Sequence, residues 1–177
     1  MPEAECIIAC EPARECARLR RLARGHVDVI GQRGGELGRR LSHVFEDVFR
    51  LGIASIVVIA SDLPDLPPRL IREAFAALDA AGDRVVIGPA ADGGYYLVGM
   101  SRPHPALFRR IDWSTNNVLA QTLDAARADG IRVFLLDQWA DVDSASDLER
   151  IVGASEAGAG RTREFALQHL GRVTADA

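Results

Sequence analysis

The 177-residue sequence contains no lysine, so all 21 of its basic residues are arginine. This absence excludes Schiff-base catalysis and any lysine clamp on phosphate, so arginine, backbone amides or a metal ion would have to bind an anionic substrate. The sequence also lacks an apolar run of roughly 18 residues and an apolar N-terminal core. We therefore expect neither a membrane span nor a signal peptide, and we predict a cytoplasmic protein.

Several familiar motifs are also absent. There is no GxSxG elbow, no GxxxxGK[ST] phosphate loop and no GxGxxG fingerprint, and the four histidines show no metal-binding spacing. Cys6, Cys10 and Cys16 have no partner at zinc-finger spacing, so we interpret them as core or incidental thiols. The net charge of −4 opposes nucleic-acid binding. These absences exclude hydrolase triads, P-loop kinases and simple dinucleotide oxidoreductases.

What the sequence does contain is an alternation of short apolar runs and longer amphipathic runs. This pattern predicts a three-layer α/β/α sandwich with a mostly parallel sheet. The runs RVVIG and YYLVGM are close enough in sequence to predict one antiparallel strand. We expect one domain over residues 1–152, followed by a linker and a C-terminal helix over residues 153–177.

The segment SDLPDLP follows an apolar run that is typical of a strand buried on both faces. Ligands of parallel α/β sheets bind outside the carboxyl ends of the strands, so Asp62 is a candidate ligand of Mg²⁺ or Mn²⁺. The alternative is that Asp62 only caps a turn. We interpret Asp65 as the cap of a helix that begins at Pro67.

The segment ADGGYYL is a second candidate for a site. Gly93 and Gly94 allow a ligand to approach the backbone, and Asp92 is placed to orient a hydroxyl group or to act as a base. The alternative is an Asp-Gly hairpin turn between two strands. Tyr95 and Tyr96 are adjacent, so we expect them to face opposite sides of the sheet.

Two further segments carry polar candidates. In DVDSASDL, Asp141 and Asp143 are two residues apart and share one side of an extended chain, and either Ser144 or Asp143 is expected to cap the next helix. That leaves one of the aspartates free for a metal ion. In IDWSTNNVL, Trp113 precedes an expected N-cap at Ser114, where free amides attract anions.

The segments QRGGELGRRL, VVIASDLPDLP, VVIGPAADGGYYLVG, IDWSTNNVLAQTL and DVDSASDL, in this order, resemble the DUF2064 family of GT-A-type glycosyltransferases. The family is similar in fold to the nucleotidyltransferases that make guanylylated molybdenum cofactor or activate phospholactate. The resemblance implies a divalent metal ion, Mg²⁺ or Mn²⁺, held by Asp62 and Asp143. It also implies an acceptor or sugar side and a cleft wall formed by Asp92, Gly93, Gly94, Trp113, Ser114 and Thr115.

The sequence departs from this family at its start. Members open with a strand and a basic loop of the type PxPGxxKTRL, and this chain has neither. Arg33, beside a glycine pair, is our candidate for substrate binding. Three interpretations follow: a longer natural chain, a short form that completes its site with a partner or as a homodimer, and a fold that has lost catalysis.

We therefore predict a metal-dependent glycosyltransferase that uses a nucleotide sugar and a small-molecule acceptor. The alternatives are a nucleotidyltransferase that uses a nucleoside triphosphate at the same metal site, and a catalytically silent binding domain. None of these readings involves a nucleic acid.

Overall fold

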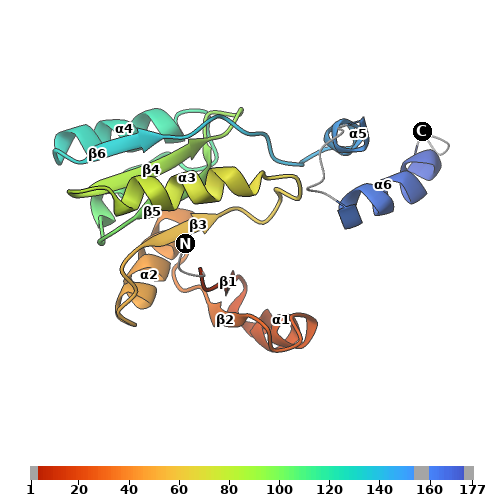
Figure 1. Cartoon of the computed structure of the whole chain (residues 1–177), viewed down its shortest axis with the longest axis horizontal. Helices are drawn as coiled ribbons and strands as arrows, with labels where there is room; N and C mark the ends of the chain where they lie inside the picture. Colours follow the sequence, from red (N-terminus) through yellow and green to blue (C-terminus); the bar gives the residue numbers. More distant parts are fainter. Residues whose placement is uncertain (1–3, 154–159, 174–177) are drawn as a thin grey trace.

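The computed structural model describes residues 4–153 and 160–173 of the chain. Its elements run in the order β1, η1, α1, β2, α2, β3, α3, β4, β5, η2, α4, β6, α5 and α6 (Figure 1). The strands fall into a sheet of four and a sheet of two. The larger sheet carries most of the core.

The larger sheet has the strand order β3, β5, β4, β6. Its strands span Ile56–Ile59 (β3), Tyr95–Met100 (β5), Arg84–Pro89 (β4) and Arg132–Leu135 (β6). Strand β5 is antiparallel to both β3 and β4, whereas β4 and β6 are parallel. Strands β3, β4 and β6 therefore share one direction, and the prediction of a single antiparallel strand is confirmed.

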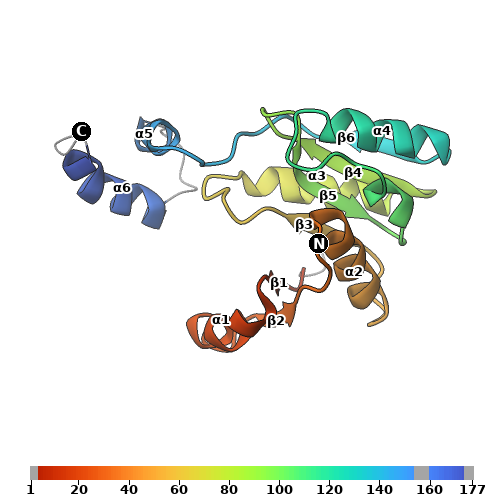
Figure 2. The ribbon, with the colours of Figure 1, turned by 180° about the vertical axis from the view of Figure 1, so that it is seen from behind.

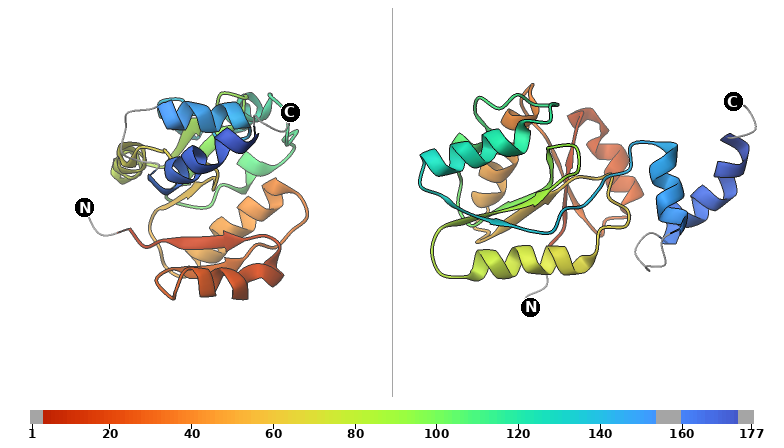
Figure 3. Two further views of the ribbon diagram at one scale, coloured as in Figure 1. Left: turned by 90° about the vertical axis from the view of Figure 1, so that its right-hand side faces the viewer. Right: turned by 90° about the horizontal axis from the view of Figure 1, so that it is seen from above.

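Helices cover both faces of this sheet. One face packs on α3 (Pro68–Asp79), and the other packs on α2 (Leu37–Phe49), η2 (Pro105–Phe108) and α4 (Val118–Ala128). Figures 2 and 3 show the sheet between these two helical layers. Side chains alternate accordingly along β4, because Val86 contacts the α3 side whereas Val85 and Ile87 contact the other. The predicted three-layer α/β/α sandwich is confirmed.

The smaller sheet holds two parallel strands, β1 (Ile7–Cys10) and β2 (Asp28–Gly31). The connection between them contains η1 (Ala13–Glu15) and α1 (Cys16–Leu22). Cys10 and Cys16 are buried with Val29 in a small cluster of their own, and Cys6 is exposed. All three are free thiols, as expected of core or incidental cysteines. Instead of one continuous sheet, the strands form two, because no described residue pairs β1 with β3.

Two helices follow the larger sheet, α5 (Ala145–Gly153) and α6 (Gly160–Val173). They contact each other, and Ile151 of α5 and Ala166 of α6 are buried. In Figure 1 they lie beyond the end of the sheet. Part of the expected linker, residues 154–159, lies outside the described residues. Within those residues, no helix has the length and apolar character that crossing a membrane requires.

Candidate active site

The segment after β6 crosses the end of the larger sheet. Backbone hydrogen bonds fix its path: Leu136 donates to Ile87 O at 2.9 Å, Trp139 donates to Pro89 O at 3.1 Å, and Val142 donates to Asp62 O at 3.1 Å. The chain thus runs from β6 past the end of β4 to the loop that follows β3. We call residues 136–143 the crossing segment. It brings two acidic stretches together that are about 80 residues apart in the sequence.

Asp62, Asp141 and Asp143 form an acidic cluster where these two stretches meet. A carboxylate oxygen from each lies within 4.8 Å of the others. Asp62 and Asp143 are exposed and Asp141 is half-buried. Among the described residues, no arginine or histidine forms an ion pair with any of the three. Like charges this close repel one another, so the cluster is suited to a cation.

The cluster contains both aspartates that the resemblance assigned to a metal ion, and metal binding by them stays a prediction. The structure brings Asp62 and Asp143 together, as a shared metal site requires, and it adds Asp141. The spacing of two between Asp141 and Asp143 was the signal for this third carboxylate. All three donors are hard oxygen atoms, without a thiolate or an imidazole, which is the donor set of Mg²⁺, Ca²⁺ or Mn²⁺.

Asp65 does not cap a helix, which corrects the sequence prediction. Helix α3 begins at Pro68, and its N-cap Pro67 makes no side-chain capping bond. Asp65 instead accepts hydrogen bonds from Trp139 Nε1 at 3.3 Å and from Arg150 Nη1 at 2.9 Å. Arg150 also donates to the carbonyl oxygens of residues 140 and 141. Asp65 therefore ties the loop after β3 to the crossing segment and to α5.

Ser144 caps α5, one of the two caps that the sequence allowed. Its Oγ accepts from the Asp147 amide at 3.3 Å, while Asp147 Oδ2 accepts from the amides of Asp143 and Ser144. These reciprocal bonds form a capping box. Hydrogen bonds from Ser144 hold the pKa of Asp147 below its ordinary value. Because the cap needs only the backbone of Asp143, its carboxylate remains available to the acidic cluster.

Asp92, Gly93 and Gly94 form the turn between β4 and β5. Asp92 Oδ1 accepts from the Gly94 amide at 2.9 Å, and Gly93 has a φ of +91°. A side chain at Gly93 would meet the backbone of Asn116, whose Cα would lie 2.7 Å from the added Cβ. Asp92 is exposed, and its Oδ2 makes no hydrogen bond within the described residues. The hairpin therefore exists as the alternative reading had it, with one carboxylate oxygen still free.

The loop over residues 111–117 packs against this hairpin and against α2. The Trp113 ring meets the Tyr95 ring edge-on, with centroids 6.3 Å apart at 79°. A Cβ added at Gly38 would lie 2.5 Å from Trp113 Nε1, so α2 approaches the indole closely. Tyr95 lies on the α2 and α4 side and Tyr96 on the α3 side, as expected for adjacent strand residues. Burial raises the pKa of Tyr96 to about 12.

Ser114 is not an N-cap, which corrects a second prediction. Helix α4 begins at Val118, its N-cap is Asn117, and Ser114 has a left-handed φ of 64°. Thr115 stabilises the loop instead, because its Oγ1 donates to Asp112 O at 2.7 Å and accepts from the Asn117 amide at 3.3 Å. Ser114 and Thr115 are both exposed.

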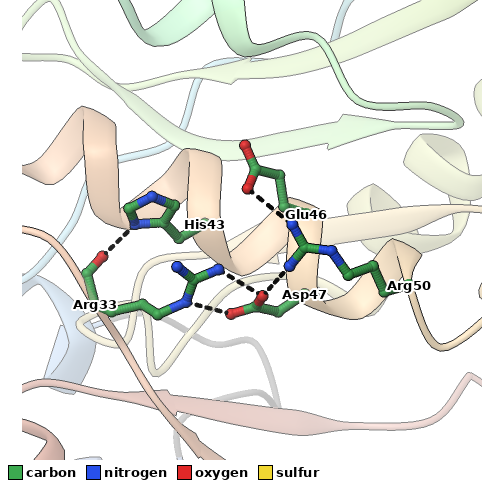
Figure 4. Close-up of polar contacts among 5 residues, drawn as sticks. All are labelled: Arg33, His43, Glu46, Asp47 and Arg50. Atoms are coloured by element: carbon green, nitrogen blue, oxygen red, sulfur yellow. Dashed lines mark hydrogen bonds and ion pairs between the residues drawn. The ribbon is translucent and has the colours of Figure 1, made fainter.

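Arg33 lies beside α2 and is held there by Asp47 (Figure 4). Its Nε and Nη2 donate to the two oxygens of Asp47 at 2.9 and 2.7 Å, and Arg50 donates to the same carboxylate at 2.6 Å. The hydrogen bond from Arg33 holds the pKa of Asp47 below its ordinary value. The Arg33 side chain is about half exposed, at 51%. The structure thus gives Arg33 an intramolecular partner, and substrate binding by Arg33 stays a prediction.

The candidates occupy one edge of the larger sheet, apart from Arg33. Strands β3, β4 and β6 all end at this edge, so the acidic cluster and the Asp92 hairpin both lie along it. The fold and the candidate site together define an α/β sandwich with acidic loops at the carboxyl ends of its strands, the edge where ligands of such sheets bind. A family model described as "Uncharacterized protein conserved in bacteria (DUF2064)" matches residues 1–115, more than half of the chain. The chain belongs to the DUF2064 family.

A solved structure is similar over almost the whole chain. It is a "putative nucleotide-diphospho-sugar transferase" from Desulfovibrio desulfuricans G20, with a TM-score of 0.82 and 27% sequence identity. The match covers 96% of this chain and 74% of that one. No curated protein matches the sequence. The fold comparison and the family model therefore agree with the resemblance seen in the sequence motifs.

Proposed function

We propose that this protein is a divalent-metal-dependent glycosyltransferase that takes its sugar from a nucleotide-activated donor. The observation that carries the proposal is the convergence of Asp62, Asp141 and Asp143, without a cationic partner among the described residues, at the edge of the sheet where ligands of this fold class bind. The likeness to a solved protein assigned to nucleotide-diphospho-sugar transfer supports the same class of substrate.

In this proposal the three carboxylates hold one Mg²⁺ or Mn²⁺ ion. A bound ion of this kind supplies positive charge that neutralises a diphosphate leaving group. The crossing segment fixes the cluster, because the Val142 to Asp62 backbone bond joins its two halves and Arg150 clamps Asp65 beside it. The chain therefore holds its ligands in place before a substrate arrives, which lowers the cost of organising the site.

Asp92 is the proposed acceptor-side residue. The Gly94 amide fixes one of its oxygens, which leaves Oδ2 to accept a hydrogen bond from an acceptor hydroxyl and to take its proton. Trp113, Ser114 and Thr115, with the backbone of Gly93 and Gly94, form the proposed wall for the sugar. To bind a substrate phosphate, Arg33 would have to release Asp47. The Arg33 side chain is half exposed, which allows this exchange of partners.

Calorimetric titration of the full chain tests this proposal. We expect Mn²⁺ to bind the wild type and to be required for binding a UDP-, GDP- or dTDP-sugar. Asp62→Asn should weaken Mn²⁺ binding by on the order of a hundredfold, because it removes a charged ligand. Asp79→Asn is the matched control, since Asp79 is an exposed aspartate at the end of α3, outside the acidic cluster.

The same titration separates the alternatives. Binding of nucleoside triphosphates but of no nucleotide sugar would identify a nucleotidyltransferase and overturn the donor assignment. If the wild type binds neither metal nor nucleotide, or if Asp62→Asn binds Mn²⁺ as the wild type does, the transferase proposal fails. A catalytically silent binding domain would then be the better description.

A further inference from the structure

Four arginines border the loop that carries Trp113. Arg39 and Arg40 lie in the first turn of α2, and Arg109 and Arg110 directly follow η2. Three of them are exposed, and Arg40 is half-buried. Within the described residues, none of the four forms an ion pair or donates a side-chain hydrogen bond. We call these four residues the arginine group.

Backbone contacts bring the two arginine pairs together. A Cβ added at Gly38 would lie 2.6 Å from the carbonyl oxygen of Phe108 and 2.5 Å from Trp113 Nε1. The first turn of α2 therefore touches both the end of η2 and the indole. Arg39 and Arg109 each directly follow a residue of this contact, so the two pairs occupy one region of the surface beside Trp113.

The stability of the folded chain does not explain these arginines. Cations are unfavourable in the first turn of a helix because of the helix dipole, and the first turn of α2 contains no acidic residue. Arg110 has a left-handed φ of 57°, which is costly for a residue with a side chain. Arg40 Nε is buried and has no hydrogen-bond partner within the described residues. Each of these features costs free energy, and such costs are typical of functional sites.

The acidic residues on the same segments do not neutralise the arginine group. Glu36 precedes α2, and Asp112 follows the second arginine pair. Both are exposed, and neither forms an ion pair within the described part of the chain. The Asp112 carboxylate instead accepts a hydrogen bond from Gln121 Nε2 at 2.7 Å. Two acids face four arginines, so this region keeps an excess of positive charge.

The arginine group lies on the side of the candidate site that carries the Asp92 hairpin. Trp113 meets the ring of Tyr95 at the start of β5. The loop beyond Trp113 contacts the hairpin, because the Leu119 amide donates to Gly93 O at 2.9 Å. The acidic cluster is separate from these contacts, since it joins the loop after β3 to the crossing segment. The site therefore has an acidic side and a basic side.

We propose that the arginine group binds an oxyanion of the acceptor, so that the acceptor of this protein is an anionic small molecule with a phosphate or carboxylate group. The inference rests on the proposed function, which places the acceptor beside Asp92 and Trp113. The metal ion proposed at the acidic cluster neutralises the diphosphate of the donor, which leaves the arginines for a second anion. The planar guanidinium of arginine offers paired donors that match the oxygens of phosphate and carboxylate groups.

Heteronuclear NMR of the full 177-residue chain tests this inference without metal or nucleotide. The sequence has two tryptophans, Trp113 and Trp139, whose indole N–H signals report on the basic and the acidic side of the site. We expect inorganic phosphate to shift the Trp113 indole signal and the amide signals of Arg39 and Arg109 along a saturating curve. The Trp139 signal should not move, because Trp139 lies in the crossing segment. Acetate is the second probe, and the stronger of the two responses identifies the kind of oxyanion.

Substitutions separate binding from a structural role. Arg39→Gln and Arg109→Gln should each weaken phosphate binding by about fivefold, as for exposed ion pairs. Arg72→Gln is the matched control, because Arg72 is an exposed arginine on α3, at the other face of the sheet. Arg40→Met should weaken phosphate binding by a similar factor and leave the melting temperature unchanged or higher, since it removes a buried donor without a partner. A lower melting temperature with wild-type phosphate binding would assign Arg40 to the fold and count against the inference.

Competition identifies the substrate that supplies the oxyanion. A nucleotide sugar bound with Mn²⁺ should leave the phosphate response at Trp113 unchanged, because the donor diphosphate belongs to the acidic side. Displacement of phosphate by the nucleotide sugar would assign the arginine group to the donor and overturn the inference. So would the lack of a saturating response to both probes, or an equal response in the double variant Arg39→Gln/Arg109→Gln. Failure of the transferase proposal is distinguishable, because it would abolish Mn²⁺ binding and leave the phosphate response in place.

Discussion

Two groups of charged side chains in this protein differ in how their charges are paired. Around Asp47, arginines from a loop and a helix surround a carboxylate, and each charge has a partner. In the acidic cluster of Asp62, Asp141 and Asp143, three carboxylates meet, and none of them forms an ion pair with another described residue. A balanced network stabilises the folded chain by itself, whereas an unbalanced one costs stability until a cation binds. The comparison therefore favours a stabilising role for the pairs around Asp47 and supports the proposed metal binding by the acidic cluster.

The largest expected effect comes from Asp141, the member of the cluster that the sequence left open. Asp141→Asn removes one of three converging charges, so we expect Mn²⁺ affinity to fall by on the order of a hundredfold, as for Asp62→Asn. Transferase activity should fall at least as far. Without metal, the variant should melt at the same temperature as the wild type or higher, because repulsion between carboxylates is relieved. Calorimetry measures the affinity, thermal unfolding measures the melting temperature, and a transfer assay measures the activity.

Asp137→Asn provides a comparison on the same segment. Asp137 lies in the crossing segment but pairs with Arg69 at 2.9 Å, away from the cluster. Its substitution should leave Mn²⁺ affinity unchanged. If Asp141→Asn retains wild-type affinity, the cluster holds metal through Asp62 and Asp143 alone, and the contrast between the two charged groups becomes weaker.

Arg150 forms an ion pair and also borders the acidic cluster. Its substitution should affect metal binding less than the substitution of Asp141. It pairs with Asp65, which is 13% exposed, and donates to two carbonyl groups of the crossing segment. Arg150→Met should lower the free energy of unfolding by about 1 kcal/mol. It should also weaken Mn²⁺ binding by about tenfold, because Arg150 positions the segment that carries Asp141.

A double variant distinguishes positioning from simple destabilisation. If Arg150 acts through the crossing segment, Arg150→Met should add little to the loss of metal affinity in Asp141→Asn, because the two residues are coupled. A full additional tenfold loss would contradict this role. The melting temperature, measured without metal, reports the structural part separately.

Much of the fold could be predicted from the sequence because its signals are local. The apolar runs, the antiparallel pair around ADGG and the opposite faces of Tyr95 and Tyr96 follow from side-chain alternation. The meeting of Asp62 and Asp143 could also be predicted, because strands that run in one direction end at one edge. These inferences need only periodicity and strand direction.

One error arose where a side chain binds a distant partner, and the other where the backbone takes a left-handed conformation. Asp65 has the residue type and spacing of a helix cap, but it binds Trp139 and Arg150, which lie 74 and 85 residues away in sequence. Ser114 has the residue type of a cap, but its left-handed φ delays the helix until Val118. Sequence spacing does not reveal such tertiary contacts. The division into two sheets could not be predicted either, because local sequence patterns do not determine which strands pair.

Substitution of Asp47 tests the paired charges around this residue, and its effect should be smaller still. Asp47→Asn removes the negative charge that pairs with Arg33 and Arg50 and replaces one accepting oxygen with an amide nitrogen, so we expect a loss of about 0.5–1 kcal/mol in the free energy of unfolding, as for partly exposed ion pairs. Mn²⁺ affinity should not change. Urea unfolding and calorimetry on the same sample measure the two effects. A loss of metal binding would show that the two charged groups are coupled.

The smallest expected effect is the pH dependence of the stability that Asp47→Asn loses. Because hydrogen bonds from Arg33 lower the pKa of Asp47 in the folded chain, the stabilisation is fully present above the unfolded pKa of about 3.9 and disappears as pH falls through the lower folded value. The stability difference between wild type and Asp47→Asn should therefore stay constant from about pH 5 to 8 and shrink below about pH 4. Asp83 and Asp147 also have lowered pKa values, so only the difference between the two proteins isolates Asp47. A difference that persists unchanged in acid would mean that Asp47 stabilises the chain through packing, and the balanced network would lose its electrostatic explanation.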